Sequence, residues 1–486
     1  MTTLTELEAS LGPVARGPII GSEVRGGPDT IAVVDPATEE VVADVAGADV
    51  DTAVTAVDTA ELALAPWSAR NPRERSDVLR RAYDLMISRC EALARLIVLE
   101  NGKALPDARA EIRYAAEFFR WYSEEAVRLT GEITTAPAGT NRIMVLHKPI
   151  GVALLITPWN FPAAMATRKI GPALAAGCTV VLKPASETPL TALALGRLLA
   201  EAGAPPGVVN VVPSRRSGAV ASRLLDDPRV RKISFTGSTE VGRDLLAHAA
   251  RAIVNSGMEL GGNAPFLVFG DADLDSAVEG AMVAKLRNGG SACTAANRFI
   301  VDESIADDFA ARLAQAMSTL TVGPGMDPGT DIGPLVNSKT REKVSRLVDD
   351  ALASGAKALV GAEAPPRRGF YYLPTVLAAV PRDAQILGEE IFGPVAPITT
   401  FTDTDEAVAL ANATEYGLVS YVYTGDLRNG LRVGERLDSG MVGINRPVVS
   451  DPAAPFGGTK QSGLGREGGH EGMLEYTETQ YLAVDW

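Results

Sequence analysis

From residue 151 onward, short runs of β-branched and aliphatic residues alternate with longer segments rich in Ala and Leu. We expect strands at 151–156, 178–182, 208–212 and 233–235, and helices near 163–176, 190–202 and 239–250. This alternation is typical of βαβ units and predicts an α/β fold with a parallel, doubly wound sheet. Ligands of such sheets bind at the carboxyl ends of the strands. A second alternating series, at 265–269, 273–284, 298–301 and 304–319, predicts a second α/β domain.

Upstream of this region, apolar residues recur near helical spacing between 73 and 99, which predicts an amphipathic helix. Asn101-Gly102 provides a stop signal for this helix. Cys90 lies among the apolar positions, so we expect a buried small hydrophobic residue rather than a reactive thiol. Cys178 begins a predicted buried strand and is expected to be structural.

The composition argues against several classes of protein. The 486 residues include 46 Lys plus Arg and 60 Asp plus Glu, a formal net charge of −14 without a dense basic stripe, which argues against a nucleic-acid partner. The three His and three Cys lack the spacing of a zinc site or a disulfide framework, so we expect no metal. The amino terminus lacks the features of a secretory signal, and no apolar run reaches the ~18 residues of a membrane span. We therefore expect a soluble, cytoplasmic protein without a membrane partner.

Polar turns follow three of the predicted strands, at 157–162, 183–189 and 235–242. Because these turns share one edge of the predicted sheet, they form a plausible cofactor cleft. Gly237 and Gly242 open a predicted helix, where free backbone N–H groups and the helix dipole can hold a pyrophosphate. Their GxxxxG spacing is also compatible with an ordinary strand-to-helix turn.

Three further residues have side chains suited to catalysis. Cys293 lies in a segment of small residues that leaves room for a substrate, and is either a nucleophile or a packed thiol. Glu259, a lone carboxylate in a Gly-rich turn, is either a general base or a solvated turn residue. Asn160 either caps the helix that follows it or donates its amide to an oxyanion.

The order of these motifs along the chain is more specific than any one of them. The chain contains, in sequence, Pro-Trp-Asn-Phe-Pro, Lys-Pro-Ala-Ser, Phe-Thr-Gly-Ser-Thr-Glu-Val-Gly, Glu-Leu-Gly-Gly-Asn, the Cys293 segment, Glu-Glu-Ile-Phe-Gly-Pro and Pro-Phe-Gly-Gly. This series resembles the aldehyde dehydrogenase superfamily over nearly the whole chain. The resemblance implies a Rossmann-type NAD(P)-binding domain (1–126 and 150–261), an α/β catalytic domain (262–476) and a small β oligomerisation extension (127–149 and 477–486). It also implies a homodimer or homotetramer.

In that family the matching Cys attacks the aldehyde, so the resemblance implies that Cys293 forms a thiohemiacetal and then a thioester. The amide of Asn160 and the backbone N–H of Cys293 are implied to stabilise the oxyanion. Glu259 is implied to activate the water that hydrolyses the thioester. The presence of this base argues against a CoA-acylating relative.

The resemblance also implies a cofactor, NADP or NAD. Its contacts map onto Ile156, Thr157, Pro158, Trp159, Lys183, Ser186, Gly237, Ser238, Glu390 and Phe392. Many NAD-preferring members carry a Glu where this chain has Ser186, and the small hydroxyl leaves space for a 2′-phosphate with which Lys183 could pair. We therefore expect NADP to be accepted, with Arg215 or Arg216 as a further anchor.

The segments 160–169, Arg287-Asn288 and 463–468 most closely resemble the succinate semialdehyde dehydrogenase branch. That branch binds the distal carboxylate of its substrate with two Arg and a Ser, and these align with Arg168, Arg287 and Ser450. Phe456 is assigned to the same pocket. A guanidinium group suits this task because it matches a carboxylate in a bidentate manner. Without the family context, both arginines could instead be surface or inter-domain ion-pair partners.

The sequence departs from the branch at Asn445-Arg446-Pro447, which we expect to insert a further cation and a rigid residue beside the pocket. The first functional hypothesis is therefore oxidation of a short aldehyde with a distal carboxylate, with succinate semialdehyde as the best candidate. Glutarate semialdehyde, a longer oxo-acid or an aromatic aldehyde remain alternatives. From another class of protein, the chain could be a non-catalytic, cofactor-binding member of the family.

Overall fold

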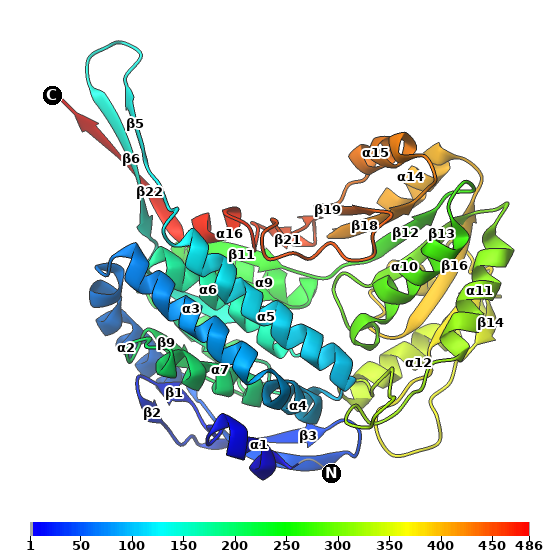
Figure 1. The fold of residues 1–486 in the computed structure, drawn as a ribbon, viewed down its shortest axis with the longest axis horizontal. Helices are drawn as coiled ribbons and strands as arrows, with labels where there is room; N and C mark the ends of the chain where they lie inside the picture. Colours follow the sequence, from blue (N-terminus) through cyan, green and yellow to red (C-terminus); the bar gives the residue numbers. More distant parts are fainter. Residues whose placement is uncertain (1–2, 486) are drawn as a thin grey trace.

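The computed structural model describes residues 3–485, and this part of the chain forms two α/β lobes with a narrow sheet projecting from one of them (Figure 1). The first lobe is built on an eight-stranded sheet. Its strands lie in the order β2 (Glu23–Val24), β1 (Ile19–Ile20), β9 (Val209–Val211), β8 (Thr179–Lys183), β7 (Val152–Ile156), β10 (Val230–Thr236), β11 (Asn255–Glu259) and β21 (Gly463–Leu464). The five strands from β9 to β11 are parallel, which confirms the predicted doubly wound α/β fold.

Helices cover both faces of this sheet, so its central strands are apolar on both sides. One face carries α3 (Pro72–Ser88), α5 (Leu105–Glu125), α6 (Pro162–Ala176) and α7 (Pro189–Glu201), and the other carries α2 (Val50–Ser68), α8 (Ser217–Leu225) and α9 (Thr239–Ala249). Along β7, Ala153 and Leu155 enter the first core, whereas Val152 and Leu154 enter the second. This alternation follows from the two-residue period of a strand.

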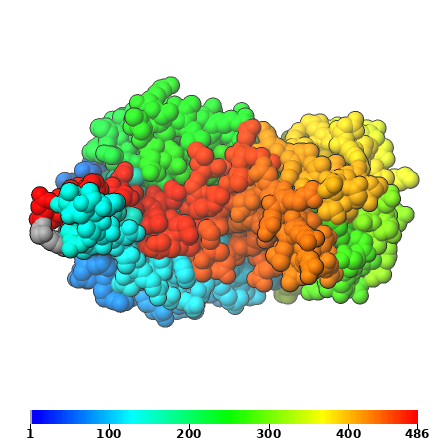
Figure 2. All heavy atoms as spheres, turned by 90° about the horizontal axis from the view of Figure 1, so that it is seen from above, coloured from blue at the N-terminus to red at the C-terminus, as the bar shows by residue number. Residues whose placement is uncertain are grey.

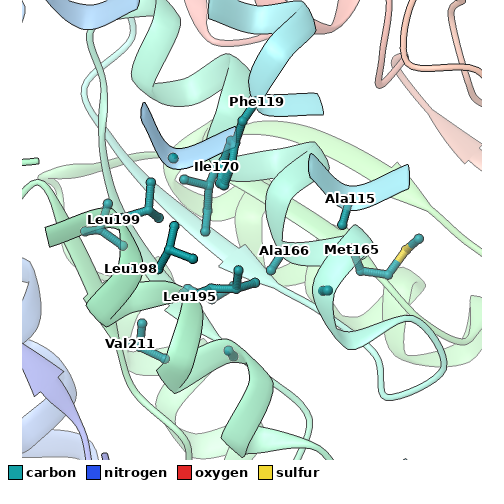
Figure 3. Packing of buried hydrophobic residues seen from close by; sticks show 14 of the residues in the cluster. Ala115, Phe119, Met165, Ala166, Ile170, Leu195, Leu198, Leu199 and Val211 are labelled. Atoms are coloured by element: carbon teal, nitrogen blue, oxygen red, sulfur yellow. The ribbon is translucent and has the colours of Figure 1, made fainter. Parts of the chain in front are cut away.

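The first core is densely packed between α5, α6 and α7. Figure 3 shows Phe119 of α5, Ile170 of α6 and Leu195 of α7 among its members. All fifteen residues of α6 are buried, as expected for a helix enclosed by other elements. Its two cations, Arg168 and Lys169, are therefore enclosed as well and require partners inside the protein.

The second lobe contains a seven-stranded sheet. Its strands lie in the order β14 (Lys357–Val360), β15 (Thr375–Ala378), β16 (Val395–Phe401), β13 (Ala296–Asp302), β12 (Ala264–Val268), β18 (Val419–Tyr423) and β19 (Met441–Ile444). The sheet is flanked by α10 (Leu274–Leu286), α11 (Ala306–Ser318), α12 (Ser338–Ala353), α14 (Thr404–Asn412) and α15 (Leu427–Arg436). Every pair is parallel except β14 with β15. The second predicted strand-helix series thus forms a sheet of its own.

The projecting sheet has three antiparallel strands: β5 (Glu132–Thr135), β6 (Arg142–Pro149) and β22 (Thr477–Val484). It carries the end of the chain away from the two lobes (Figure 1). Before it, the orange and red carboxyl-terminal part of the chain runs across one face of the molecule (Figure 2). A separate hairpin, β3 (Asp29–Asp35) with β4 (Glu40–Gly47), lies near the amino terminus together with α1 (Leu4–Leu11). Smaller elements are β17 (Tyr416–Gly417) with β20 (Thr459–Lys460), α13 (Gln385–Gly388), α16 (Glu471–Leu474) and the 3-10 turns η1 (Ala250–Ala252) and η2 (Arg287–Gly290).

The helix predicted for 73–99 is in fact two helices, because α3 ends at Ser88 and α4 runs from Cys90 to Asn101. Arg89 leaves the helical conformation between them, and its guanidinium donates two hydrogen bonds to Glu201 of α7. The predicted stop is confirmed, since Gly102 adopts a left-handed conformation.

The structure also describes the two cysteines predicted to be buried. Cys90 is half-buried rather than buried, because it lies at the break between α3 and α4. Cys178 is fully buried immediately before β8, as predicted. Among residues 3–485, no helix is both long and apolar enough to cross a bilayer.

Candidate active site

The predicted nucleophile lies in a loop between the two lobes' sheets, just before β13. Cys293 is partly exposed, and burial of its sulfur raises the pKa of the thiol to about 12. The positive charge of Arg168 lowers the pKa of this thiol, and the negative charges of Glu390 and Glu259 raise it. At neutral pH the thiol is therefore protonated, and its attack on a substrate requires a base to take the proton.

Glu259, the last residue of β11, has the environment of a tuned base rather than of a solvated turn residue. Its side chain is buried, and neither carboxylate oxygen has a hydrogen-bond partner within residues 3–485. Burial raises the pKa of Glu259 well above its usual value, and the neighbouring charge of Glu467 raises it further. A carboxylate in such a site accepts a proton far more readily than one in water.

Asn160 does not cap the helix that follows it, because Phe161 occupies the cap position of α6 and no side chain caps that end. The Asn160 amide nitrogen instead donates to the carbonyl of Ser291, two residues before Cys293, at 3.0 Å. Its side chain thus reaches across to the nucleophile loop. This orientation agrees with the alternative role as an oxyanion donor.

The turn between β10 and α9 is built for close packing. A Cβ on Gly237 would collide with the ring of Phe235, and one on Gly242 would collide with the side chain of Leu260. Ser238 caps α9 by accepting from the N–H of Val241 at 3.4 Å, and Ser238 and Val241 are exposed. The first turn of α9 therefore presents backbone N–H groups to solvent, an arrangement that suits a pyrophosphate.

Lys183 is the last residue of β8, and it begins the second of the three polar turns predicted from the sequence. It is buried, donates to the carbonyl of Pro184 at 3.0 Å, and burial lowers its pKa to about 8. Ser186 donates to the carbonyl of Ser214 at 3.0 Å and carries no charge. The two arginines proposed as further anchors bind the β3 strand instead: Arg215 donates to the carbonyl of Thr30, and Arg216 pairs with Asp29 at 2.9 Å.

The remaining predicted cofactor residues lie at the end of β7, in the loop after it and in the segment before β16. Ile156 ends β7, and Thr157, Pro158 and Trp159 follow it in the loop that leads to α6. The rings of Trp159 and Phe392 meet edge to face at 5.3 Å. Glu390 accepts from the N–H of Gly262 at 3.3 Å, and burial raises the pKa of Glu390 to about 7. The loop after β7 in the first lobe and the segment before β16 in the second lobe thus meet at Trp159 and Phe392.

Arg168 already has a carboxylate partner. It is fully buried in α6 and pairs with Glu467, with 2.5 Å between Nε and Oε2. The same carboxylate binds Lys169, and the Arg168 guanidinium lies 4.2 Å from the ring centre of Phe456. The ion-pair interpretation from the sequence therefore describes Arg168 well, whereas its role in substrate binding stays a prediction.

Arg287 differs from Arg168. It is half-buried, and its guanidinium lies over the rings of Tyr114 at 5.5 Å and Phe161 at 5.1 Å. Within residues 3–485 it forms no salt bridge. Its side chain also lines a small cavity together with Ala292, Thr294, Tyr421 and residues 447–449, directly beside the nucleophile loop.

The loop after β19 only partly matches the expectation. Pro447 does line the cavity that contains Arg287, and the half-buried Ser450 follows closely in the same loop. Arg446, however, is exposed and donates to the carbonyl of Val448 at 2.9 Å. The expectation that Arg446 adds a cation to the pocket is therefore wrong, because its own backbone loop draws the side chain to the surface.

Comparison with known proteins identifies the family of the chain. The model of the aldehyde dehydrogenase family matches residues 24–482. The chain belongs to the aldehyde dehydrogenase family. It is 54% identical over 444 residues to a succinate-semialdehyde dehydrogenase of Paenarthrobacter nicotinovorans, covering 91% of this chain and 99% of that protein. It is 48% identical over 455 residues to a glutarate-semialdehyde dehydrogenase of Pseudomonas aeruginosa, covering 94% of each.

Solved structures of aldehyde dehydrogenases superpose closely on the whole chain. The crystal structure of an Escherichia coli NADP-dependent enzyme has a TM-score of 0.96 and 47% identity, covering 98% of this chain and 99% of that one. A succinate-semialdehyde dehydrogenase from Burkholderia pseudomallei has a TM-score of 0.95 and 46% identity, covering 98% of each. The predicted family and fold are therefore confirmed, and the protein is an NAD(P)-dependent aldehyde dehydrogenase.

This aldehyde dehydrogenase holds its catalytic loop with residues that sequence reasoning missed. Lys285 donates to Asn297 at 3.0 Å and so closes the base of the loop that carries Cys293. Lys103 and Glu111 contact the segment around Asn160, and Glu467 pairs with both cations of α6. Glu467 had a sequence signal, a charged residue within the Gly-rich segment 463–469. Lys103 had none, because its partners lie 8 and 57 residues away.

The arrangement suits a dinucleotide and an organic substrate. Ser238 caps an exposed first turn of α9, and the ammonium of Lys183 donates to the carbonyl of Pro184. Both groups fit the phosphates of a dinucleotide, which would lie across the ends of β7, β8 and β10. Among the described residues, no group of three or more His, Cys, Asp or Glu could hold a metal ion.

Proposed function

We propose that this aldehyde dehydrogenase oxidises a short aldehyde with a distal carboxylate, with succinate semialdehyde as the first candidate. The observation that carries the proposal is Arg287, a half-buried guanidinium beside the Cys293 loop that has no carboxylate partner among residues 3–485. A half-buried guanidinium that forms no salt bridge among these residues can bind the carboxylate of an anionic substrate tail. The two relatives named for succinate and glutarate semialdehyde support an acidic substrate.

In the first chemical step, the Cys293 thiol gives its proton to a base from the solvent, since Cys293 is partly exposed, and its sulfur adds to the aldehyde carbon. The resulting oxyanion of the thiohemiacetal accepts hydrogen bonds from the Asn160 amide and the Cys293 backbone N–H. Fixed donors of this kind stabilise a transition state by about 3–4 kcal/mol each. A nicotinamide cofactor held at the ends of β7, β8 and β10 would supply the hydride acceptor, and loss of hydride from the thiohemiacetal carbon would leave Cys293 as a thioester.

In the second step, Glu259 takes a proton from a water molecule while the water oxygen attacks the thioester carbon. The C–S bond breaks, the Cys293 sulfur leaves, and the product is a carboxylate. Because the pKa of Glu259 is raised by burial, its conjugate acid can return a proton to the departing sulfur. No step requires a histidine, which agrees with the three histidines of the chain lying in other segments.

We propose that both NADP and NAD are accepted and that Ser186 favours NADP. The neutral hydroxyl of Ser186 leaves room for a 2′-phosphate, and Lys183 would supply the positive charge. Arg215 and Arg216 would have to release their contacts with β3 before either could assist. The NADP-dependent Escherichia coli enzyme among the similar structures supports this preference.

We also propose that the chain assembles into a homodimer or homotetramer through the sheet of β5, β6 and β22. This sheet projects from the lobes, and Ile133 and Tyr481 on it expose large hydrophobic side chains. Light scattering of the wild type against a variant that lacks 477–486 tests this assignment, and an unchanged mass would contradict it.

The substrate proposal is tested by kcat/KM of the wild type for succinate semialdehyde, glutarate semialdehyde and butanal, each with NAD and NADP. We expect the acidic aldehydes to exceed butanal by ~10-fold or more, because only they can pair with Arg287. A higher value for glutarate than for succinate semialdehyde would assign the longer acid. Equal values for all three would refute the acidic substrate, and no NAD(P)H with any aldehyde would indicate a non-catalytic member.

A further inference from the structure

A buried ion pair lies directly behind the proposed oxyanion site. Lys103, between α4 and α5, and Glu111, on α5, approach to 2.5 Å, and their side chains are 2% and 0% exposed. Enclosing two charges in this way costs desolvation free energy that the pair itself rarely recovers. Lys103 lines a small cavity together with Trp159, Asn288 and Ser291, whereas Glu111 is enclosed completely. Stability alone therefore does not explain why these two charges are buried together.

The remaining hydrogen bonds of the pair converge on one short segment. The Lys103 ammonium also donates to the backbone carbonyl of Asn160 at 2.7 Å and lies 4.4 Å from the ring centre of Phe161. The second oxygen of Glu111 accepts from the N–H groups of Ala163 at 2.9 Å and Ala164 at 3.3 Å.

These contacts hold the chain on both sides of Phe161. Lys103 fixes the peptide that carries Asn160, and Glu111 satisfies the first turn of α6, which has no side-chain cap of its own. The direction in which the Asn160 side chain leaves the backbone is therefore set by the ion pair. Charged donors and acceptors make stronger and more directional hydrogen bonds than neutral ones.

The nucleophile loop is tied to the same point. Asn288 donates its side-chain amide to the carbonyls of Asn160 at 2.8 Å and Ser291 at 2.9 Å. Its backbone N–H donates to Asp107 of α5 at 2.9 Å, and its φ of 57° is a left-handed conformation that such contacts must maintain. Helix α5 thus supports both expected oxyanion donors, Asn160 through Glu111 and Lys103, and Cys293 through Asp107 and Asn288.

We propose that Lys103, Glu111 and Asn288 are positioning residues that set the distance and angle between the Asn160 amide and the Cys293 backbone N–H. The inference rests on the proposed roles of Asn160 and Cys293 and adds the residues that make those roles geometrically possible. A displacement of about 1 Å at a reacting centre costs on the order of 100-fold in rate. Loss of this support therefore lowers kcat rather than the affinity for cofactor.

The test is a double-mutant cycle on the intact enzyme. Lys103→Met, Glu111→Gln and Asn288→Ala are each made alone and in the Asn160→Ala background. Each single variant is expected to lower kcat by ~10-fold or more, with KM for the cofactor within about twofold of wild type. In the Asn160→Ala background, Lys103→Met and Glu111→Gln are expected to lower kcat by less than about threefold, because the amide they position is already gone. Asn288→Ala is expected to lose less than it does alone, because it still displaces the Cys293 N–H.

Asn288→Ala keeps the proposal testable if breaking the ion pair prevents folding, since it removes a bond to Asn160 without leaving a buried charge. Glu117→Gln is the matched control, because Glu117 lies on the same helix and pairs with Arg120 on the exposed side. We expect it to leave kcat unchanged. Losses in kcat that simply multiply with that of Asn160→Ala, or a raised cofactor KM with unchanged kcat, would overturn the proposal. Full activity of Asn160→Ala would instead refute the proposed oxyanion role, and the positioning role with it.

Discussion

Replacing Arg287 by Met should separate acidic from neutral aldehydes. Two aromatic rings, those of Tyr114 and Phe161, lie against the guanidinium, and no carboxylate among residues 3–485 pairs with it. The N–H groups at its edge are therefore available to a substrate carboxylate. Met keeps much of the apolar stem that packs beside these rings, so the change removes mainly the charge and the N–H donors.

The size of the effect follows from the environment of the guanidinium. Removing one partner of a desolvated charge pair costs about 2–5 kcal/mol, and the half-buried position of Arg287 favours the lower part of that range. At about 1.4 kcal/mol per factor of ten, a loss of ~2–3 kcal/mol lowers kcat/KM for succinate semialdehyde by about 30- to 150-fold. Butanal has the same chain length but no carboxylate, so its kcat/KM should fall by less than about threefold.

The assay is the initial rate of NADPH formation at subsaturating aldehyde, with both aldehydes measured on each variant. Arg287→Lys is the matched control, because it keeps the charge but loses the planar fork, and its loss should lie between those of wild type and Arg287→Met. Equal losses for succinate semialdehyde and butanal would show that Arg287 supports the loop rather than the substrate. No loss for either aldehyde would refute its role altogether.

Three further outcomes are expected. Glu259→Gln should release one NADPH per site in a rapid burst and then turn over at least ~100-fold more slowly than wild type. The reason is that acylation does not need the base that activates water for hydrolysis of the thioester. Stopped-flow absorbance measures both phases, and an unchanged steady-state rate would exclude Glu259 as the base. In the wild type, kcat should rise with pH through the raised pKa of Glu259, since only the ionised carboxylate accepts a proton, and the Gln variant should lose this rise. Ser186→Glu should lower kcat/KM for NADP by ~10-fold or more through charge repulsion while leaving NAD nearly unchanged, and similar losses with both cofactors would contradict the assignment.

Local pattern was sufficient to predict most of the fold. The buried strands β7 and β8 are short apolar runs bounded by polar turns, and the sheet order β9-β8-β7-β10 places strands from later in the chain on either side of them. The break at Arg89 could not be predicted, because α3 and α4 each bury an apolar face and the helical period continues across the break. At the break, Arg89 pairs with Glu201 of α7, which is 112 residues away in the sequence.

The sequence indicated Glu259 as a lone carboxylate in a Gly-rich turn, whereas in the structure Glu259 is the last residue of β11, a strand that the sequence did not predict. The sequence did not predict which charged partners the side chains of the site have, or which of these side chains are exposed. The partner of Arg168, Glu467, lies in the carboxyl-terminal part of the chain and comes close only because that part folds across the first lobe. Similarly, the sequence contains Arg446 beside a pocket residue, but only the local backbone decides that its side chain turns to the surface.

The role of Cys293 as the nucleophile is tested most directly by the mass of the enzyme trapped as its thioester. Glu259→Gln is mixed with succinate semialdehyde and NADP, quenched in acid, digested, and analysed by mass spectrometry. We expect a succinyl group on the peptide that contains Cys293, and none on the peptides of Cys90 or Cys178. NADPH formation without any acyl group on Cys293, or with the group on another cysteine, would contradict it.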